Sequence, residues 1–338
     1  MHKIRAALPL IAIFAAVASV AQPQNVLETP KTRVEVLGLR RWTVPMIQDS
    51  LARYAPGDSL TSHACAAILR GKLKFPDAAA SYFEPDGTGR ALIVVAVVEP
   101  QDSALVRYLS PAPDSLPDLA RYSAAIASFR KYNSDFQRLI QDSAFLVGHS
   151  LPRQADASWI RLEPVRRLMA SEHTPAGQRR AARVLARDRN PYNRMMALVV
   201  MSGFPKSDVT WLTLANELRY PDGMVSATAS QLITTLARYA PRTVDWRPGL
   251  DGITAVMAGT NLFAQLPLIE VLTKTKISTA LAPPVMRAGT PLLLARLAAS
   301  RQAGSERTRE LLEQLSGQKY GNDVTAWTQW AVTVQGGP

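Results

Sequence analysis

Two stretches of this sequence echo each other 32 residues apart: DRNPYNRMMA at 188–197 and YPDGMVSATA at 220–229. In each stretch, a helical run stops at a polar corner that contains proline, and a second apolar helix begins at once. Ala197 and Ala229 occupy the same phase of the two helices. A corner that recurs at this spacing is typical of helical hairpins stacked into a solenoid. Because solenoids mostly bind other molecules, the pattern favours a binding protein over an enzyme.

The helical pattern continues on both sides of the echo. Thr174-Pro175 predicts a helix start, since a capping side chain is followed by proline at the first helical position. One hairpin cannot cover its own apolar stripe, but stacked neighbours can. We therefore predict an all-α helical-repeat domain at 173–334, whose repeat number stays open after Pro241. The expected helices cover 177–186, 193–201, 208–218, 224–239, 250–257, 261–272, 285–297, 305–315 and 324–332.

Part of this helical region resembles a known repeat family. LARDRNP at 185–191 and LRYPDGMV at 218–225 are similar to the leucine, acidic corner and apolar restart of HEAT-type repeats. The resemblance covers about 174–316. It implies a HEAT-like solenoid that acts as a protein-interaction scaffold, and no catalytic residues come with it.

The chain before the array has a different pattern, which alternates polar and apolar residues at 33–37 and predicts a strand. The spacing then predicts a helix at 44–54 and a second helix capped by Ser59 or Thr61. Two further strands are expected, and a hairpin turn at 85–89 joins them. The order β-α-α-β-β predicts a small α+β module at 32–99 with two helices on one face of its sheet. The two further strands cover 78–83 and 91–98.

This first region resembles the polypeptide-transport-associated (POTRA) module of bacterial outer-membrane assembly and secretion proteins. The matching elements are VLG at 36–38, PGDSL at 56–60, the segment 69–75 and VAVVE at 95–99. The resemblance covers about 33–99. It implies a periplasmic docking module that accepts a peptide strand along a sheet edge.

A segment with four prolines separates the two regions. Residues 100–117 predict a Pro-rich linker and a domain boundary. Residues 118–172 then predict bridging helices, because apolar residues recur there at spacings of three and four. The bridging helices are expected at 119–132, 135–147 and 159–169.

The first 21 residues are typical of an export signal. Lys3 and Arg5 precede an apolar run at 6–20, and the small residues Ser19 and Ala21 at the two positions that a signal peptidase reads predict cleavage before Gln22. A retained membrane anchor is the alternative, but the run is short of the roughly 20 residues that a bilayer crossing needs. We therefore expect a periplasmic or secreted protein with no stable transmembrane segment after cleavage.

Composition limits the class of protein further. The chain is 47% hydrophobic and 20% charged, which favours a well-buried core over disorder. Cys65 is its only cysteine, so internal disulfides cannot stabilise the fold, and we expect a buried, unreactive side chain. The formal charge of +12 falls to +10 once Lys3 and Arg5 leave with the signal. Outside the cytoplasm, the expected anions are an acidic protein or an anionic envelope component, not nucleic acid.

Arginines cluster at the start of the helical array. Between 153 and 194 there are ten arginines against four acidic residues. Arg179, Arg183 and Arg187 are four apart and so share one helix face, and Arg180 and Arg194 lie near them in sequence. A planar guanidinium pairs well with carboxylates and phosphates, which makes these five residues candidates for binding an anionic partner. The alternative is an ordinary solvated face with intrahelical ion pairs.

No constellation in the sequence predicts catalysis. His63, His149 and His173 form no spaced pair with another metal-binding residue, and GHS at 148–150 lacks the strand-to-helix elbow of a nucleophilic serine. The glycines of the first region lie in turns, not in a phosphate-binding loop. We therefore predict no catalytic, cofactor-binding or metal-binding residues and no cofactor.

Three functions remain open. The leading one is an exported, non-enzymatic scaffold or adaptor that binds protein partners through its helical surface and its small docking module. The alternative is a cell-envelope biogenesis accessory that captures unfolded or outer-membrane polypeptides, for which the module needs an open sheet edge. The second alternative is an enzyme with a site between the two halves, which requires ionisable groups that meet there within hydrogen-bonding reach.

Overall fold

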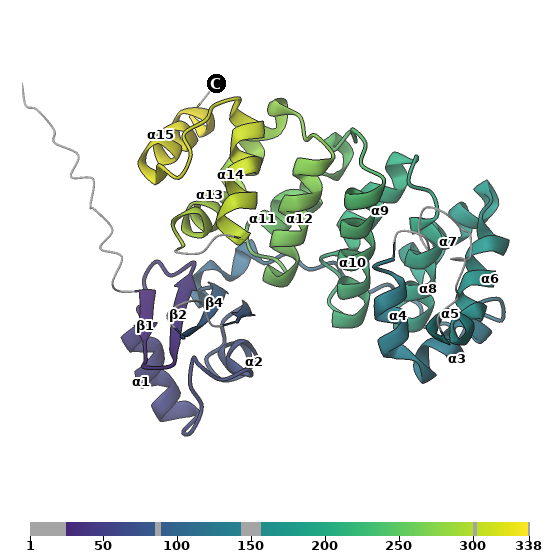
Figure 1. The fold of residues 1–338 in the computed structure, drawn as a ribbon, viewed down its shortest axis with the longest axis horizontal. Coiled ribbons are helices and arrows are strands. Elements are labelled where there is room, and N and C mark those ends of the chain that lie inside the picture. The colour runs from purple at the N-terminus through teal and green to yellow at the C-terminus, as the bar shows by residue number, and fades with distance from the viewer. Residues whose placement is uncertain (1–24, 85–88, 143–156, 300–302, 337–338) are drawn as a thin grey trace, which may run out of the picture.

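The computed structural model describes residues 25–84, 89–142, 157–299 and 303–336, and comprises a small α+β module followed by sequentially packed helices (Figure 1). None of the helices in these ranges combines the length and the hydropathy that a membrane crossing requires. The module contains β1 (Val26–Glu28), β2 (Thr32–Leu37), α1 (Val44–Tyr54), α2 (Cys65–Gly71), β3 (Asp77–Phe83) and β4 (Ala91–Val98). After a short 3₁₀ helix η2 (Pro100–Leu105), the bridging helices are α3 (Ser123–Lys131), α4 (Asn133–Leu139), α5 (Ala157–Arg161) and α6 (Glu163–Glu172).

The remaining helices form the array. They are α7 (Pro175–Arg187), α8 (Pro191–Ser202), α9 (Asp208–Glu217), α10 (Gly223–Tyr239), α11 (Leu250–Met257), α12 (Leu262–Lys274), α13 (Ala282–Ala298), α14 (Ala303–Ser316) and α15 (Val324–Gln335), with 3₁₀ turns η4 (Arg247–Gly249) and η5 (Thr279–Leu281) between them. Each expected helix of the array is present, with its ends shifted by a few residues at most.

The module has a mixed sheet in the order β1-β2-β4-β3, with β2 parallel to β4 and the other pairs antiparallel. Val34 and Val36 of β2 stand opposite Ile93 and Val95 of β4, and these side chains are buried against α1 and α2. This confirms the expected strands and the expected helices on one face. Strand β1 was not predicted from the sequence. It has only three residues, and this is too short for a recognisable alternation of polar and apolar side chains.

The second helix of the module begins later than expected. The side chains of Ser59 and Thr61 bond each other at 2.7 Å, so neither caps a helix. The chain instead turns through Ser62, whose hydroxyl accepts from the Ala64 backbone N–H, and α2 starts at Cys65. The prediction of a cap at Ser59 or Thr61 was therefore wrong: short polar side chains also stabilise turns, and here the turn uses them.

The other face of the sheet is also buried, and the array covers it. Apolar side chains of the sheet form a small core with α12 and α13, which lie far along the chain. The members are Leu37, Ala79, Ala96, Val98, Leu262 and Leu292. Figure 1 shows the result: the module lies beneath the C-terminal half of the array, while α3 to α6 lie at the opposite end.

Two glycines let the module and the array come this close. Gly38 has φ +89°, and a Cβ there would overlap the Val97 carbonyl oxygen and touch Leu292 at 3.0 Å. Gly259 has φ +118°, and a Cβ there would overlap a methyl group of Val98. Both positions thus require glycine for conformation and for space.

A buried carboxylate fixes the loop between β2 and α1. Glu99 follows β4 and is fully buried. Its Oε1 accepts from three successive backbone N–H groups, those of Arg40, Arg41 and Trp42, at 2.7, 2.9 and 2.8 Å. Charge-assisted bonds of this kind offset the cost of burying the carboxylate.

The array consists of two layers of helices. In one layer α8, α10, α12 and α14 pack side by side, and in the other α9, α11, α13 and α15 do so. Consecutive helices such as α7 and α8, or α9 and α10, form the hairpins. Ala181, Ala197 and Ala229 are fully buried, as expected for small residues at close helix contacts.

The two echoed corners act as helix caps. Asn190 accepts from the backbone N–H groups of Tyr192 and Asn193, and so caps α8. Asp222 accepts from Met224 and Val225 at 2.9 and 3.0 Å, and so caps α10. The 32-residue echo in the sequence therefore corresponds to the same capping arrangement at the start of α8 and of α10.

Residues 106–119, which we call the strap, connect the module to the bridging helices. The strap crosses three hairpin corners of the array in reverse order. The Arg107 N–H donates to Thr260 Oγ1, Leu109 to the Arg219 carbonyl and Asp114 to the Arg187 carbonyl, at 2.7, 2.9 and 3.1 Å. The expected linker therefore begins with η2, and its remainder from residue 106 onward is bound along the array in an extended conformation.

The corner between α7 and α8 makes the tightest contact with the strap. Asp188 is fully buried there, and its carboxylate accepts from the Leu116 backbone N–H and the Asn193 side-chain amide. The amide of Asn193 also donates to the Pro117 carbonyl, while its oxygen accepts from the Leu119 N–H. Buried polar groups therefore pair the strap with the corner.

The bridging helices are shorter than expected. The helix predicted at 119–132 begins at Ser123, and the helix predicted at 135–147 ends at Leu139, although residues from 143 onward lie outside the described ranges. The predicted helix at 159–169 is broken at Leu162, because Pro164 starts a new helix, α6. Together α3 and α6 pack on α8, and 10 of the 12 residues of α8 are buried.

We predict that Gly259→Ala destabilises the protein more than Gly57→Ala does. Both glycines have positive φ, but nothing lies within 4 Å of a Cβ at Gly57, whereas a Cβ at Gly259 meets Val98. The overlap should cost about 1–3 kcal/mol beyond the backbone strain that the two variants share. Urea unfolding of both variants measures the difference, and equal free energies of unfolding would contradict the tight docking of the module.

Candidate functional site

Three arginines that are four residues apart lie on the exposed face of α7. Thr174 caps this helix by accepting from the Gly177 N–H at 3.0 Å, and Ala181 and Leu185 are buried against α8. The opposite face exposes Arg179, Arg183 and Arg187, which we call the arginine row. Neighbours in the row are separated by about 6 Å along the helix axis. Within the described ranges, no carboxylate forms an ion pair with any of the three.

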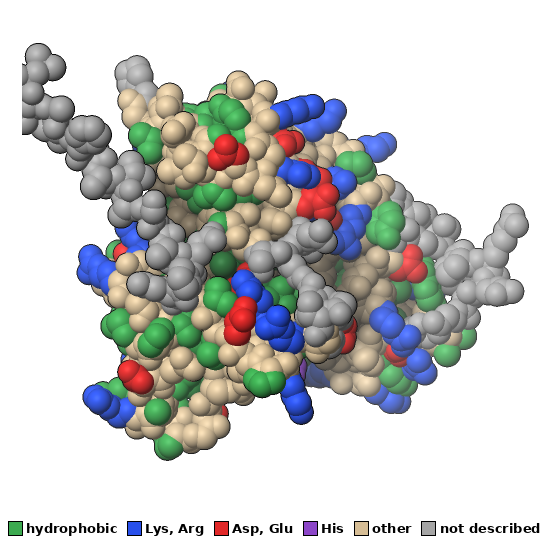
Figure 2. All heavy atoms as spheres, turned by 60° about the vertical axis from the view of Figure 1, so that its left-hand side comes forward, with side chains coloured by type: hydrophobic (Ala, Val, Ile, Leu, Met, Phe, Trp, Pro, Cys, Tyr) green, Lys and Arg blue, Asp and Glu red, His purple; other side chains and the backbone are tan. Residues whose placement is uncertain are grey.

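Several other arginines in this part of the chain are already paired, although Arg189, close to the row, is exposed and has no ion pair within the described ranges. Glu163 contacts Arg166 at 2.6 Å and Arg167 at 2.9 Å, and Asp135 contacts Arg161 at 2.6 Å. These pairs match the mixed-sign surface seen elsewhere: Figure 2 shows one face of the molecule, on which acidic and basic side chains are interspersed. The arginine row differs from this pattern because the nearby carboxylates serve other cations.

Arg180 lies on the same helix but is bound to a carboxylate. It contacts Glu172 at 2.7 Å, and Arg121 contacts the other oxygen of Glu172 at 2.7 Å. Burial would raise the pKa of Glu172, but hydrogen bonds from Arg180 and Arg121 hold that pKa below its ordinary value. Arg180 therefore helps to join α7 to the bridging helices.

Arg194 lies apart from the arginine row, because α8 is surrounded by other helices. Its side chain is 2% exposed and contacts Glu217 Oε2 at 2.5 Å. It also donates to the carbonyls of Leu185 and Asp188, at 2.6 and 2.9 Å, and stacks on the Tyr220 ring at 3.7 Å. The sequence places Arg194 close to the arginine row, but in the structure its side chain joins the corner between α7 and α8 to the corner between α9 and α10.

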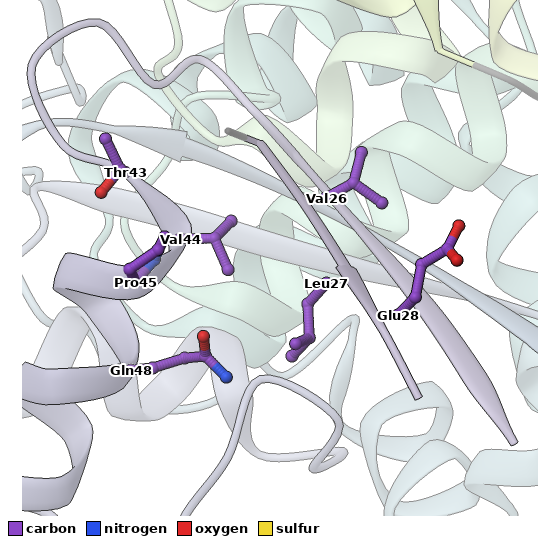
Figure 3. Close-up of a pocket in the computed structure, with 7 residues that line it drawn as sticks. All are labelled: Val26, Leu27, Glu28, Thr43, Val44, Pro45 and Gln48. Atoms are coloured by element: carbon purple, nitrogen blue, oxygen red, sulfur yellow. The ribbon is translucent and has the colours of Figure 1, made fainter. Parts of the chain in front are cut away.

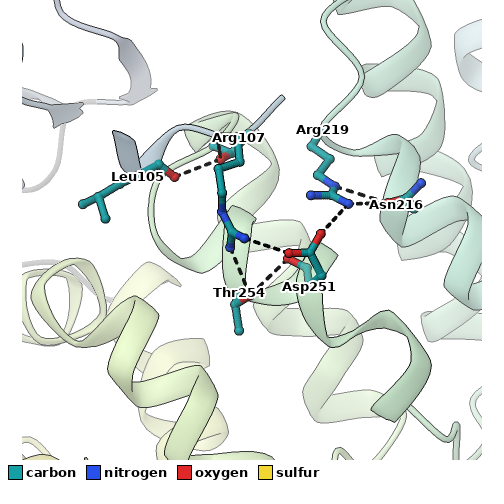
Figure 4. A network of polar contacts seen from close by, with 7 residues as sticks. Leu105, Arg107, Asn216, Arg219, Asp251 and Thr254 are labelled. Atoms are coloured by element: carbon teal, nitrogen blue, oxygen red, sulfur yellow. Dashed lines mark hydrogen bonds and ion pairs between the residues drawn. The ribbon is translucent and has the colours of Figure 1, made fainter. Parts of the chain in front are cut away.

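A second polar network anchors the strap (Figure 4). Asp251 of α11 contacts Arg107 of the strap at 2.7 Å and Arg219, beside α9, at 2.8 Å. Burial opposes ionisation of Asp251, but Arg219 and Arg107 hold its pKa below the ordinary value. Arg107 also donates to the Thr254 hydroxyl at 3.2 Å. Sequence reasoning missed this network, because its members come from three distant segments.

The ionisable groups that meet between the two halves surround one buried carboxylate, Asp77, while Tyr108 is 38% exposed and the Arg70 side chain 42% exposed. Asp77 is 1% exposed, and its Oδ2 accepts from the Tyr108 hydroxyl at 2.8 Å and from the Leu262 N–H at 3.3 Å. Its Oδ1 accepts from the Ala78 N–H and lies 3.7 Å from Arg70. Burial raises the pKa of Asp77, although the Tyr108 hydroxyl and the Arg70 charge oppose that shift. The cluster thus joins module, strap and array.

Strand β3 is an edge of the sheet. It pairs with β4 on one side, and within the described ranges no backbone group pairs with its other side. Tyr82 and Phe83 near its end are both more than a third exposed. The Tyr82 hydroxyl donates to the Ser62 carbonyl at 2.7 Å, and the His63 ring stacks on Tyr82 at 4.2 Å.

A pocket of about 360 Å³ lies between β1 and the first turn of α1 (Figure 3). Its walls are largely apolar, and the Glu28 carboxylate at its rim contacts Arg33 at 2.5 Å. The pocket belongs to the module and is separate from the arginine row. The lining residues are Val26, Leu27, Glu28, Thr43, Val44, Pro45 and Gln48.

The described ranges contain no group of three or more histidine, cysteine or acidic side chains that could hold a metal ion. Cys65 is buried beside the Tyr82 hydroxyl, and burial raises the pKa of its thiol. His173 stacks on Phe204 at 5.0 Å. His149 and the GHS sequence lie outside the described residues.

We predict that Arg194→Leu lowers the free energy of unfolding by about 3–5 kcal/mol, because it leaves the Glu217 carboxylate buried without its cation. Arg183→Leu, which changes an exposed arginine on the neighbouring helix, should leave stability nearly unchanged. Thermal and urea unfolding of the two variants test the assignment. Similar stability in both would contradict the separation of Arg194 from the arginine row.

Comparison with models of known protein families, with curated proteins and with solved structures finds no match to this chain. The function must therefore be argued from the geometry of the molecule. What the structure supplies is a small mixed sheet with helices, an array of sequentially packed helices, and a row of exposed arginines on α7.

Proposed function

We propose that this chain is an exported, non-enzymatic scaffold that binds an acidic protein partner through the arginine row of α7. The observation that supports this most strongly is the contrast between Arg179, Arg183 and Arg187 and the paired arginines around them. A cation that already holds a buried carboxylate has less charge to offer a ligand, as with Arg180. The three charges of the row face solvent and hold no carboxylate within the described ranges.

We further propose that the array is a HEAT-type solenoid and that the module is related to POTRA modules. The stacked hairpins with capped corners support the first assignment. The order β2-α1-α2-β3-β4, with β2 parallel to β4, supports the second. In this proposal the signal at 1–21 is removed before Gln22, and the mature protein works in the periplasm or outside the cell.

The test is charge reversal of the whole row. Arg179→Glu, Arg183→Glu and Arg187→Glu together should weaken capture of an acidic partner from envelope extracts about tenfold or more at low ionic strength. The loss should shrink as salt is added, because exposed charges are screened. Retention is measured by quantitative pull-down with the full chain as bait.

Arg287→Glu is the control for a single reversal and is compared with Arg183→Glu alone, because each of these two variants lowers the net charge by two. Arg287 is an exposed arginine on another helix of the array, α13, and stands outside the arginine row. This variant should retain the partner. Equal retention by the triple variant and the wild-type chain would contradict the proposed binding role of the row.

A second candidate function is supported by the open edge of β3. A module whose edge strand lacks a neighbour can accept an extended polypeptide as an additional strand, with main-chain hydrogen bonds as the source of affinity. The exposed Tyr82 and Phe83 beside this edge would contact alternate side chains of such a peptide. This is the envelope-biogenesis role, in which the protein captures unfolded chains.

Hydrogen exchange tests the second candidate. Adding a urea-unfolded outer-membrane polypeptide to the native protein should slow amide exchange in β3, because its free N–H groups gain partners. The opposite edge, β1, serves as the internal control and should not change. Binding without protection of β3, or protection of both edges alike, would contradict strand addition at β3.

A further inference from the structure

One arginine of the array is buried without an acidic partner. Arg296 lies in the last turn of α13 and is 6% exposed. Within the described ranges, its guanidinium makes one hydrogen bond, from Nε to Gln265 Oε1 of α12 at 2.5 Å, and forms no ion pair. Both Nη groups, which carry most of the N–H donors of an arginine, therefore lack a partner in that part of the chain.

Arg194 shows how this chain otherwise buries an arginine, since Arg194 and Arg296 are the two buried arginines of the described ranges. Glu217 neutralises Arg194, two backbone carbonyls accept from it, and the Tyr220 ring stacks on it. Arg296 has only the neutral amide of Gln265, and the dipole at the end of α13 supplies only a partial negative charge. Burying a cation is costly unless an anion accompanies it.

The polar surroundings of Arg296 leave one end of its guanidinium for a ligand. Burial lowers the pKa of Arg296 to about 10, so the group is still a cation at neutral pH. The Nε2 of Gln265 donates to the Met257 carbonyl at 3.1 Å, which turns Oε1 of the same amide toward Arg296. Because this oxygen engages Nε, the end that carries the two Nη groups is the end that a ligand can pair with.

We infer that Arg296 binds the carboxylate of a small molecule. The two Nη groups offer parallel N–H donors that match the two oxygens of a planar carboxylate. One negative charge neutralises the buried guanidinium, whereas the dianion of phosphate would bring a second charge into the interior. Solvent contacts Arg296 over only 6% of its surface, so the group that reaches it must be small.

This site is independent of the arginine row and of the proposed protein partner. Leu292 and Ala299, on either side of Arg296 in α13, pack against the second face of the sheet. The site therefore lies beside the contact between the module and the array, whereas the arginine row is on α7.

The experiment uses the full ¹⁵N-labelled chain at pH 7 and sodium acetate as the probe. The Nε–H signal that disappears from the NMR spectrum of Arg296→Gln is assigned to Arg296. Acetate should shift this signal saturably, and sodium chloride at the same ionic strength should not. Sodium phosphate should need a concentration about fivefold higher or more for the same shift.

Gln265→Glu tests the role of the buried charge without removing the arginine. A carboxylate at residue 265 would pair with Arg296 and compete with acetate, which should then bind about tenfold more weakly. Arg287→Gln is the matched control, because it removes an exposed arginine from the same helix, and it should leave acetate affinity unchanged.

Thermal unfolding provides a second measurement. Acetate should raise the Tm of the wild-type chain by about 2 °C or more relative to chloride, because it binds the folded state. The Tm of Arg296→Gln should not respond to acetate. If Arg296→Gln does not fold, the Tm of Gln265→Glu gives the same test and should not respond either.

Two results would overturn the inference. If acetate changes neither the Arg296 signal nor the Tm of the wild-type chain, or raises the Tm of Arg296→Gln equally, Arg296 is not a carboxylate site. If phosphate acts as strongly as acetate, the site binds anions in general and the assignment to carboxylates is wrong. Both results leave the proposed function of the arginine row standing, because charge reversal on α7 tests it with other residues.

Discussion

The close contact between the module and the array determines the arrangement of the rest of the molecule. A Cβ at Gly259 would overlap Val98, and a Cβ at Gly38 would overlap the Val97 carbonyl oxygen and lie 3.0 Å from Leu292. The sheet has two apolar faces, of which its own helices cover one, and the second must be buried elsewhere. The array supplies that cover through Leu262 of α12 and Leu292 of α13. The N-terminal module is therefore held against α12 and α13, near the C-terminal end of the array.

This docking explains the course of the strap. A chain that leaves the module near α12 must travel back along the array before it can begin α3 at the other end. The strap follows the hairpin corners because these expose carbonyls and polar side chains, such as the Arg219 carbonyl and Asp188, that satisfy an extended backbone. Corner residues thus cap helices and also fasten the connection between the two halves.

The arginines illustrate how one residue type serves two purposes. Arg194 is enclosed because α8 is the most covered helix of the array, so its charge is used internally, by Glu217. The arginine row lies on α7, whose outer face exposes three charges with no ion pair in the described part of the chain. Charge that folding does not use remains available for binding, and this is the physical basis of the proposed scaffold.

Local signals in the sequence predicted most of the elements. Alternation predicted β2, a continuous apolar run predicted β4, apolar periodicity predicted the helices, and polar corners such as those of Asn190 and Asp222 predicted the hairpins. The four-residue spacing of Arg179, Arg183 and Arg187 also placed them on one face in advance. Only the tertiary structure decided that the sheet is covered twice, that the linker is a bound strap and that Arg194 is buried. The apolar run ALIVVAVV at 91–98 is typical of a strand buried on both faces, but the order of the elements predicted cover on one face only. The run does not indicate that α12 and α13 cover the second face, because contacts between distant segments depend on how whole surfaces fit together and not on the local sequence pattern.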